Sequence, residues 1–173
     1  MRALRLAEGS PQDQKSRSVA VSIDDERFMR LALAQAERAR GHTGDNPWVG
    51  AVIAKDGEVI GDGHTHPPGS DHAEIAAIKS ALSRGASLEG ATIYSTLEPC
   101  SFHGRTPACA LAIVEHRIAR VVIGMRDPHP RVNGEGLTIL RGAGVEVIEG
   151  VLEPEVARSL APWIDAYHPH AKR

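Results

Sequence analysis

Strand-like and helix-like segments alternate along the second half of this sequence, with short connections between them. The expected strands are 91–97, 120–125 and 145–151, and the expected helices are 107–116, 136–144 and 153–167. The strands ATIYSTL and RVVIGM are rich in β-branched residues, which is typical of strands inside a sheet. An alternation of this kind predicts a sheet that contains parallel strands and carries helices on both faces.

The first half of the chain predicts a helix followed by a hairpin. Residues 25–40 have helical periodicity, with Ser22 or Asp24 as the N-cap. The residues expected to share the buried stripe of this helix are Phe28, Leu31 and Ala32. Residues 48–64 contain two strand-like runs around the Asp-Gly pair at 56–57, which is the strongest short signal for a β-hairpin.

A second helix is expected at 72–82, with Ile75, Ile78 and Leu82 at helical spacing. In a sheet with helices on both faces, ligands gather beyond the carboxyl ends of the strands. The polar sequences LEPC and RDPHP follow the first two strands of the second half. The sequence therefore places its most informative polar residues where a binding site is expected.

The composition is that of one ordinary globular domain. The chain has 173 residues, of which 42% are hydrophobic and 24% charged, and we expect a mobile polar tail at 1–21 and a single domain at 22–173. With 20 basic and 22 acidic residues, the net charge of −2 disfavours binding to nucleic acid or to a membrane surface. The sequence has no apolar run of membrane-spanning length and no secretory signal pattern, which predicts a cytoplasmic protein.

The only two cysteines in the sequence, Cys100 and Cys109, lie in one polar stretch, EPCSFHGRTPAC. They could form a disulfide, pack together in the core or bind a metal ion. A cytoplasmic chain is expected to keep its thiols reduced, which disfavours the disulfide. Thr106 and Pro107 predict an N-cap and a first helical residue, so that the helix N-terminus would lower the pKa of the Cys109 thiol and favour the zinc-binding thiolate.

A third metal ligand and a proton carrier are available at the start of the helix at 72–82. His72 and Glu74 are two residues apart and do not share a helix face, so they cannot both chelate one ion comfortably. They can divide the work, with His72 binding the metal and Glu74 reaching the water beside it. The alternative is that Asp71 and Glu74, which have the spacing of a capping box, only cap the helix.

The order of these motifs is typical of zinc deaminases, in which one histidine and two cysteines bind zinc and a glutamate moves protons. The chain has eight residues between its cysteines, where the common signature has two. Four strings, NPWVGAVI, HAEIAAI, TLEPCSFHGRTPAC and MRDPHPRVNGEG, resemble the deaminase domain of the riboflavin-biosynthesis deaminase/reductase (RibD-type) family. In that family the second cysteine also follows a longer loop, and the resemblance covers about residues 25–160.

The resemblance implies a three-layer α/β/α cytidine deaminase-like fold with a central mixed sheet of about five strands. It also implies that His72, Cys100 and Cys109 are the ligands of a Zn²⁺ ion. Glu74 corresponds to the catalytic proton shuttle of the family. A structural zinc site, with His103 as a fourth protein ligand, is the alternative that involves no enzyme.

The substrate contacts follow only from the resemblance. Asn46 matches an asparagine that contacts the substrate, and Asp127 matches the aspartate of a DPNP motif in which His129 replaces the asparagine. Arg105 occupies a position where many members have lysine, and both side chains suit a phosphate. Thr65 replaces a histidine that many members carry, and we assign it no role.

Two further groups of polar residues allow a structural interpretation. Glu98, in the LEPC string, either accepts hydrogen bonds from backbone N–H groups near the metal loop or contacts substrate. The histidines outside the motifs, His168 and His170 among them, are expected to be solvated or capping residues.

The predicted function is zinc-dependent hydrolytic deamination of a phosphoribosylated diaminopyrimidine, an early riboflavin intermediate, with release of ammonia. The alternatives are deamination of another nucleobase, nucleoside or secondary-metabolite heterocycle, or editing of nucleic acid, which the charge balance disfavours. The resemblance implies a homodimer or larger assembly. Because the sequence ends just past the last deaminase helix, we expect no nicotinamide cofactor and a separate reductase if the chain acts in the riboflavin pathway.

Overall fold

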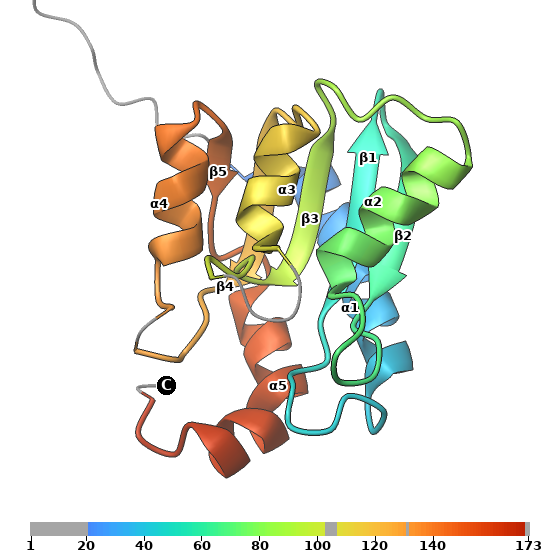
Figure 1. Ribbon diagram of the computed structural model, residues 1–173. Helices are drawn as coiled ribbons and strands as arrows, with labels where there is room; N and C mark the ends of the chain where they lie inside the picture. The colour runs from blue at the N-terminus through green and yellow to red at the C-terminus, as the bar shows by residue number, and fades with distance from the viewer. Residues whose placement is uncertain (1–20, 103–106, 131, 172–173) are drawn as a thin grey trace, which may run out of the picture.

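The computed structural model describes residues 21–102, 107–130 and 132–171, which leaves most of the tail predicted at 1–21 outside the described residues. The elements in these ranges are α1 (Ile23–Ala39), β1 (Gly50–Lys55), β2 (Glu58–His64), α2 (Ala73–Ser83), β3 (Thr92–Leu97), α3 (Cys109–Glu115), β4 (Arg120–Met125), α4 (Glu135–Gly142), β5 (Glu146–Ile148) and α5 (Glu153–Tyr167) (Figure 1). No helix among them is both long and apolar enough to cross a membrane.

The five strands form one mixed sheet in the order β2-β1-β3-β4-β5. Strand β1 is antiparallel to both of its neighbours, β2 and β3. Strands β3, β4 and β5 are parallel to one another, and helices connect them. The structure therefore confirms the predicted mixed sheet of five strands, with its parallel part in the second half of the chain.

Helices cover both faces of the sheet. Ile53 of β1 belongs to the larger core, to which α2, α3 and α4 contribute, whereas its neighbour Val52 packs in a second core with Phe28 and Met29 of α1. Figure 1 shows α2, α3 and α4 in front of the sheet and α1 behind it. Side chains of α5 approach β4 closely, because a Cβ on Gly124 would lie 2.5 Å from a Val156 methyl. The predicted three-layer arrangement is confirmed.

The hairpin between β1 and β2 forms where it was predicted. The residues at its tip, Asp56 and Gly57, both have positive φ, at 52° and 80°. Two-residue hairpin turns with positive φ at both positions match the twist of the strands, and Asp-Gly tolerates them best. The predicted strand at 145–151 was too long, because only Glu146–Ile148 pair with β4.

Helix α1 begins with a complete capping box. The Ser22 hydroxyl accepts a hydrogen bond from the Asp25 backbone N–H at 3.1 Å, and the Asp25 carboxylate accepts one from the Ser22 N–H at 2.9 Å. Ser22, and not Asp24, is therefore the N-cap. The prediction that Leu31 is buried was wrong, since the helix rests on the sheet at Ala32, where a Cβ on Gly50 would collide with the helix backbone.

Helix α2 packs on the sheet through alanines. At Gly61 and Gly63 of β2 an added Cβ would lie 2.5 Å from backbone atoms of Ala77, so the helix sits directly on the strand. This close approach orients small residues inward and pushes larger ones to the flank. Leu82, which has helical spacing with Ile75 and Ile78, accordingly lies on the flank of the helix, where 47% of it is exposed.

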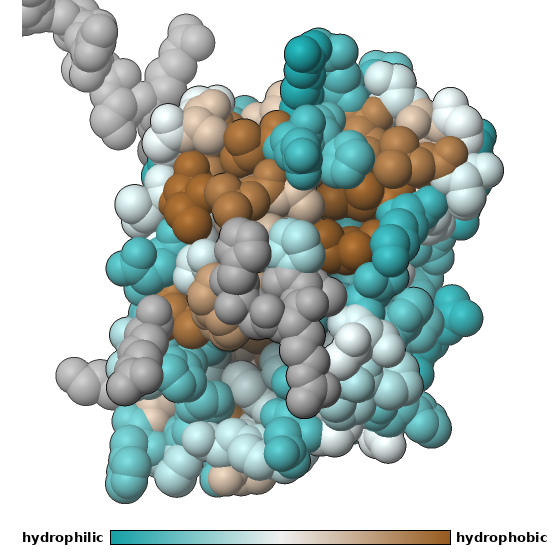
Figure 2. All heavy atoms as spheres, in the orientation of Figure 1, coloured by the Kyte–Doolittle hydropathy of each residue, from teal (hydrophilic) through white to brown (hydrophobic). Residues whose placement is uncertain are grey.

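Apolar side chains gather on the outer surface of α2, α3 and α4. Figure 2 shows this surface in the orientation of Figure 1, with hydrophobic residues spread over the upper part of the three helices. Leu82 of α2 and Leu111 of α3 are the large exposed apolar residues that these helices contribute within the described ranges. We call this surface the apolar face.

Candidate functional site

One imidazole and two thiols converge at the carboxyl end of β3. The His72 Nδ1 atom lies 3.6 Å from Cys100 Sγ and 3.4 Å from Cys109 Sγ. The three donor atoms lie within 4.8 Å of one another, and both cysteines are free thiols. A tetrahedral zinc ion, about 2.3 Å from sulfur and about 2.0 Å from nitrogen, spaces such donors by roughly 3.5–3.8 Å. The three side chains therefore fit a zinc ion.

Three element ends bring these donors together. His72 is the N-cap residue of α2, Cys100 follows β3, and Cys109 is the first residue of α3. The prediction that α3 starts at Pro107 was wrong by two residues, and Thr106 lies outside the described residues. The Ala110 N–H donates to the Cys100 carbonyl at 3.2 Å, which fixes the start of α3 beside the end of β3.

The helix N-terminus acts on Cys100, and not on Cys109 as predicted. The Cys109 N–H points at Cys100 Sγ, 3.3 Å away. The pKa of Cys100 is lowered to about 4, first by a hydrogen bond from the Cys109 thiol and then by those from His72 and this N–H. The same sulfur–sulfur hydrogen bond, together with burial, raises the pKa of Cys109. Cys109 is thus the proton donor of the thiol pair when no metal is bound.

The His72 imidazole carries the positive charge beside the Cys100 thiolate. Its pKa is raised to about 9, chiefly by its hydrogen bond to Cys100 and also by the nearby charge of Glu74. The metal-free cluster therefore holds a thiolate next to an imidazolium. Because metal ligands must be deprotonated, zinc binding would release protons from His72 and Cys109.

Glu74 is a buried carboxylate beside the metal cluster. Only 4% of the residue is exposed, and its Oε1 atom accepts a hydrogen bond from the Ser95 hydroxyl at 3.2 Å. Burial raises the pKa of Glu74, and the negative charge of Cys100 raises it further. The capping interpretation was wrong, because His72 is the N-cap, no side chain caps the helix, and the Asp71 carboxylate binds Lys79 at 2.7 Å instead.

A small pocket of about 130 Å³ opens beside Glu74 and His72; we call it the inner pocket. Its walls include Asn46, Thr65, Cys100 and Asp127 in addition to these two residues. The structure thus brings Asn46 and Asp127 next to the metal cluster, as the resemblance implied. The volume suits one small heterocyclic ring.

Thr65 has a structural role at this pocket that the sequence did not reveal. The side chain is buried, and its hydroxyl accepts a hydrogen bond from the Val49 N–H at 3.0 Å. Asn46 lies in the same loop, where its carbonyl accepts a hydrogen bond from the Thr43 hydroxyl at 2.7 Å. Thr65 therefore holds the segment after Asn46 in place. The sequence offered one signal for this role, because Thr65 replaces a histidine that many members of the family carry.

Glu98 binds backbone N–H groups, which is the structural one of its two predicted roles. Its carboxylate accepts hydrogen bonds from Gly134, Gly136 and Asp127 at 2.9, 3.0 and 3.3 Å. Burial raises the pKa of Glu98 against the opposing effect of these hydrogen bonds. Glu98 thereby fastens the loop that carries Asp127 to the loop that carries Cys100.

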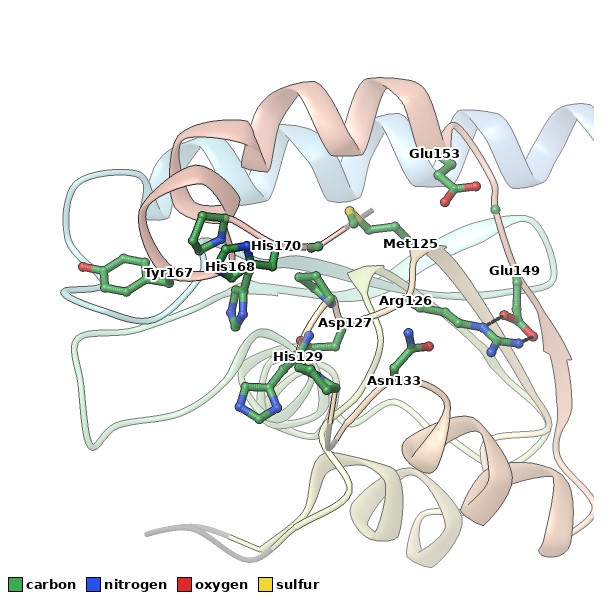
Figure 3. A pocket seen from close by; sticks show the side chains of 15 residues that line it. Met125, Arg126, Asp127, His129, Asn133, Glu149, Glu153, Tyr167, His168 and His170 are labelled. Carbon is green, nitrogen blue, oxygen red and sulfur yellow. Dashed lines mark hydrogen bonds and ion pairs between the residues drawn. The ribbon is translucent and has the colours of Figure 1, made fainter. Parts of the chain in front are cut away.

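A larger cavity of about 920 Å³ lies on the other side of Asp127. We call it the outer pocket; its walls come from Met125–Pro130, from Glu149–Gly150 and from the end of the chain, Tyr167–Ala171 (Figure 3). His129 lines the outer pocket and not the inner one. Arg105, the predicted phosphate ligand, lies outside the described residues.

Comparisons with known proteins agree with this geometry. Residues 22–125 match the family described as the cytidine and deoxycytidylate deaminase zinc-binding region. Riboflavin biosynthesis protein RibD of Escherichia coli is 47% identical over 133 residues, which are 77% of this chain and 35% of the E. coli protein. The chloroplastic riboflavin biosynthesis protein PYRD of Zea mays is 42% identical over 149 residues, which are 86% of this chain and 37% of the maize protein.

A solved structure has the same fold. The diaminohydroxyphosphoribosylaminopyrimidine deaminase/5-amino-6-(5-phosphoribosylamino)uracil reductase of Thermotoga maritima superposes with a TM-score of 0.78 at 48% identity. The match covers 82% of this chain and 40% of the Thermotoga protein. This chain therefore spans about two fifths or less of the length of each of these relatives.

Proposed function

The chain belongs to the cytidine and deoxycytidylate deaminase zinc-binding family, and on that premise we propose that it is a RibD-type pyrimidine deaminase. The substrate is the phosphoribosylated diaminopyrimidine of riboflavin biosynthesis, and the reaction replaces a ring amine by a carbonyl with release of ammonia. The observation that carries the proposal is a buried carboxylate, Glu74, beside a His-Cys-Cys cluster in a pocket the size of one ring.

His72, Cys100 and Cys109 are the proposed zinc ligands. Their donor atoms have the spacing of three corners of a zinc tetrahedron, which leaves one corner for a non-protein ligand. When bound at such a site, zinc lowers the pKa of water to about 7 and so supplies a nucleophile at neutral pH. The cysteine N–H and thiol contacts described above keep the two sulfurs at this spacing.

Glu74 is the proposed proton carrier. Its carboxylate takes one proton from the attacking water and gives it to a ring nitrogen. It then takes the remaining hydroxyl proton of the adduct and gives it to the amine, which leaves as ammonia while the carbonyl forms. A single carboxylate can both accept and donate a proton here because burial, and also the charge on Cys100, raises its pKa above the ordinary value. The Ser95 hydroxyl, hydrogen-bonded to Oε1, orients the carboxylate while it exchanges protons.

Asn46 and Asp127 are the proposed contacts to the substrate in the inner pocket. Both lie in loops that are held by specific hydrogen bonds, Asn46 by Thr43 and Asp127 by Glu98. Such support keeps polar groups positioned without substrate, which lowers the entropic cost of binding. Arg105 remains a predicted phosphate ligand.

Ammonia release by the zinc-loaded protein tests the proposed function. The panel contains the phosphorylated diaminopyrimidine, its dephosphorylated form, cytidine, dCMP and guanine. We expect turnover of the phosphorylated diaminopyrimidine, with lower kcat/KM for each other compound. If a compound that is not a diaminopyrimidine gave the highest kcat/KM, the proposed substrate would be refuted, but the assignment as a deaminase would stand.

X-ray absorption at the zinc edge separates a catalytic from a structural site. We expect two sulfurs, one imidazole nitrogen and one light non-protein ligand. A second imidazole, which His103 would supply, contradicts the catalytic proposal. In the variant C100A we expect zinc content to fall well below one ion per chain.

Partners and location complete the proposal. A second copy of the chain is the proposed partner for the apolar face, which exposes Leu82 and Leu111 (Figure 2). Light scattering should give twice the chain mass, and L82E/L111E should give the monomer mass.

A separate reductase would act on the product. The cytoplasm, where thiols such as those of Cys100 and Cys109 stay reduced, is the proposed location.

A further inference from the structure

The inner and outer pockets meet at Asp127. Asp127 is among the residues that line each of them, and its Oδ1 atom accepts a hydrogen bond from the His129 N–H at 2.8 Å. A ring held beside Glu74 would therefore direct its substituent past Asp127 into the outer pocket. The walls of the outer pocket decide which substituent is accepted.

Two imidazoles meet edge to face in the lining of this outer pocket. The ring centroids of His129 and His168 are 5.6 Å apart, with the ring planes at 82°. Figure 3 shows the His168 ring below the end of the chain and the His129 ring beside the loop after β4, on the same side of the pocket. The two rings come from segments that are 39 positions apart in the sequence (168 − 129).

The end of the chain holds His168 in a defined place. The His168 ring packs edge-on against Trp163 with the centroids 4.6 Å apart, and the backbone N–H of His168 donates to the Ile164 carbonyl at 2.7 Å. The Ala171 N–H closes the next turn by donating to the His168 carbonyl at 2.9 Å. Trp163 thus supports the imidazole, and the two backbone hydrogen bonds fix the turn that carries it.

The same helix end is tied to the loop that carries Asn46. The Trp163 indole N–H donates to the Asp45 carbonyl at 3.0 Å, and the Tyr167 hydroxyl donates to the Asp45 carboxylate at 3.0 Å. The residue that precedes Asn46 is therefore bonded to the helix that presents His168. The end of the chain connects the inner-pocket loop with the outer pocket.

Besides the imidazoles, the outer pocket is lined by the Arg126 guanidinium and by the carboxylates of Asp127, Glu149 and Glu153. The Glu149 carboxylate is neutralised by Arg126 at 2.5 Å and by Arg141 at 2.6 Å. Imidazole N–H groups form strong hydrogen bonds to phosphate oxygens, and two rings at this separation can reach one phosphate group.

We infer that the end of the chain, Tyr167–Ala171, completes the substrate site, and that His168 together with His129 binds the phosphate of the ribosyl substituent. This inference rests on the proposed function for the identity of the substrate. It assigns substrate recognition to a segment beyond the family match at 22–125. His168 determines specificity for the phosphorylated substrate and takes no part in proton transfer.

Binding of ribose 5-phosphate tests the inference without any turnover. The zinc-loaded full chain is titrated by calorimetry, and the variant H168F keeps a ring against Trp163 while it removes both ring nitrogens. We expect at least a tenfold higher Kd for H168F, as for the loss of one charge-assisted hydrogen bond. H168Q, which retains a donor, should lose only a few-fold, and the control H116F, at the far end of α3, should bind as the wild type does.

Equal affinity of the wild type and H168F, or no binding of ribose 5-phosphate to the wild type, overturns the inference.

Steady-state kinetics give a second measurement. H168F should raise KM for the phosphorylated diaminopyrimidine about tenfold with kcat nearly unchanged, and should leave the dephosphorylated compound unaffected. A wild type that binds ribose 5-phosphate through His168 but releases no ammonia from the panel refutes the proposed function and leaves the phosphate site standing.

Discussion

Asp25 and Glu74 are both buried carboxylates in the first turn of a helix, on opposite faces of the sheet, yet their pKa values move in opposite directions. Burial alone would raise the pKa of Asp25, but hydrogen bonds from Arg120 and Ser22 outweigh it and lower the value to about 2. At Glu74, burial and the Cys100 charge raise the pKa and outweigh the His72 imidazole, which lowers it. The partners, and not the residue type or the helix position, separate a structural acid from a reactive one.

Neighbouring residues of β3 serve these two acids. The Tyr94 hydroxyl donates to Asp25 at 3.1 Å, and the Ser95 hydroxyl donates to Glu74 at 3.2 Å. Successive side chains of a strand point to opposite faces, so one strand supports both sites. The Asp25 site has a bidentate ion pair, with Arg120 nitrogens at 2.6 and 3.0 Å, whereas the Glu74 site opens to a pocket. The contrast predicts that one site affects stability and the other affects turnover.

Removal of Glu74, the proposed proton carrier, should have the largest effect, which is on kcat. E74Q preserves shape and hydrogen bonding but cannot carry protons, so kcat should fall by roughly 10²- to 10⁴-fold. Zinc content by atomic absorption and the thermal midpoint should stay at wild-type values. The matched variant D25N should lose stability while the folded fraction retains its kcat; an E74Q protein that still turns over would remove Glu74 from the mechanism.

Removal of Arg120, the cation that pairs with Asp25, should have the next largest effect. R120M leaves a carboxylate buried without its partner, at a cost of about 3–5 kcal/mol in the free energy of unfolding. Denaturant unfolding with fluorescence detection measures this cost. The control R126M, which breaks an exposed pair with Glu149, should change the free energy by about 1 kcal/mol or less. Equal losses in the two variants would contradict the special position of Arg120.

Acid should weaken the Asp25 site in a defined range. The folded pKa of about 2 lies below the ordinary value of 3.8, so the contribution to stability is complete above pH ~5 and is lost as the pH falls toward ~2. The loss amounts to about 2 kcal/mol. The difference in unfolding free energy between wild type and D25N should shrink over this range, and a difference that stays constant with pH would disprove the linkage.

The smallest effects should come from the two strand neighbours. Y94F removes one hydrogen bond to Asp25 and should cost about 1 kcal/mol of stability with unchanged kcat. S95A removes the hydrogen bond to Glu74 and should lower kcat several-fold with little change in unfolding free energy. If Y94F lowered kcat and S95A lowered stability instead, the division between the two faces would be wrong.

Much of the fold could be predicted because its signals are local. The Asp-Gly turn requires positive φ at both positions, and the last helix has the predicted bounds, Glu153–Tyr167. The alternation of elements predicted the parallel strands and the helices on both faces, and the family resemblance implied the mixed sheet of about five strands. The buried stripes were less predictable, because Leu31 and Leu82 have helical spacing but are displaced from the sheet where glycines let α1 and α2 approach closely.

The sequence by itself determined which residues could form a zinc site, because His72, Cys100 and Cys109 follow from motif order at consecutive element ends. Tertiary structure alone decided that Ser22 and Asp25, and not Asp71 and Glu74, form the capping box, and that the N–H at Cys109 acts on Cys100. It also decided that the end of the chain lines the outer pocket. Spacing along a chain fixes contacts over a few residues, whereas burial and charge depend on atoms from distant segments.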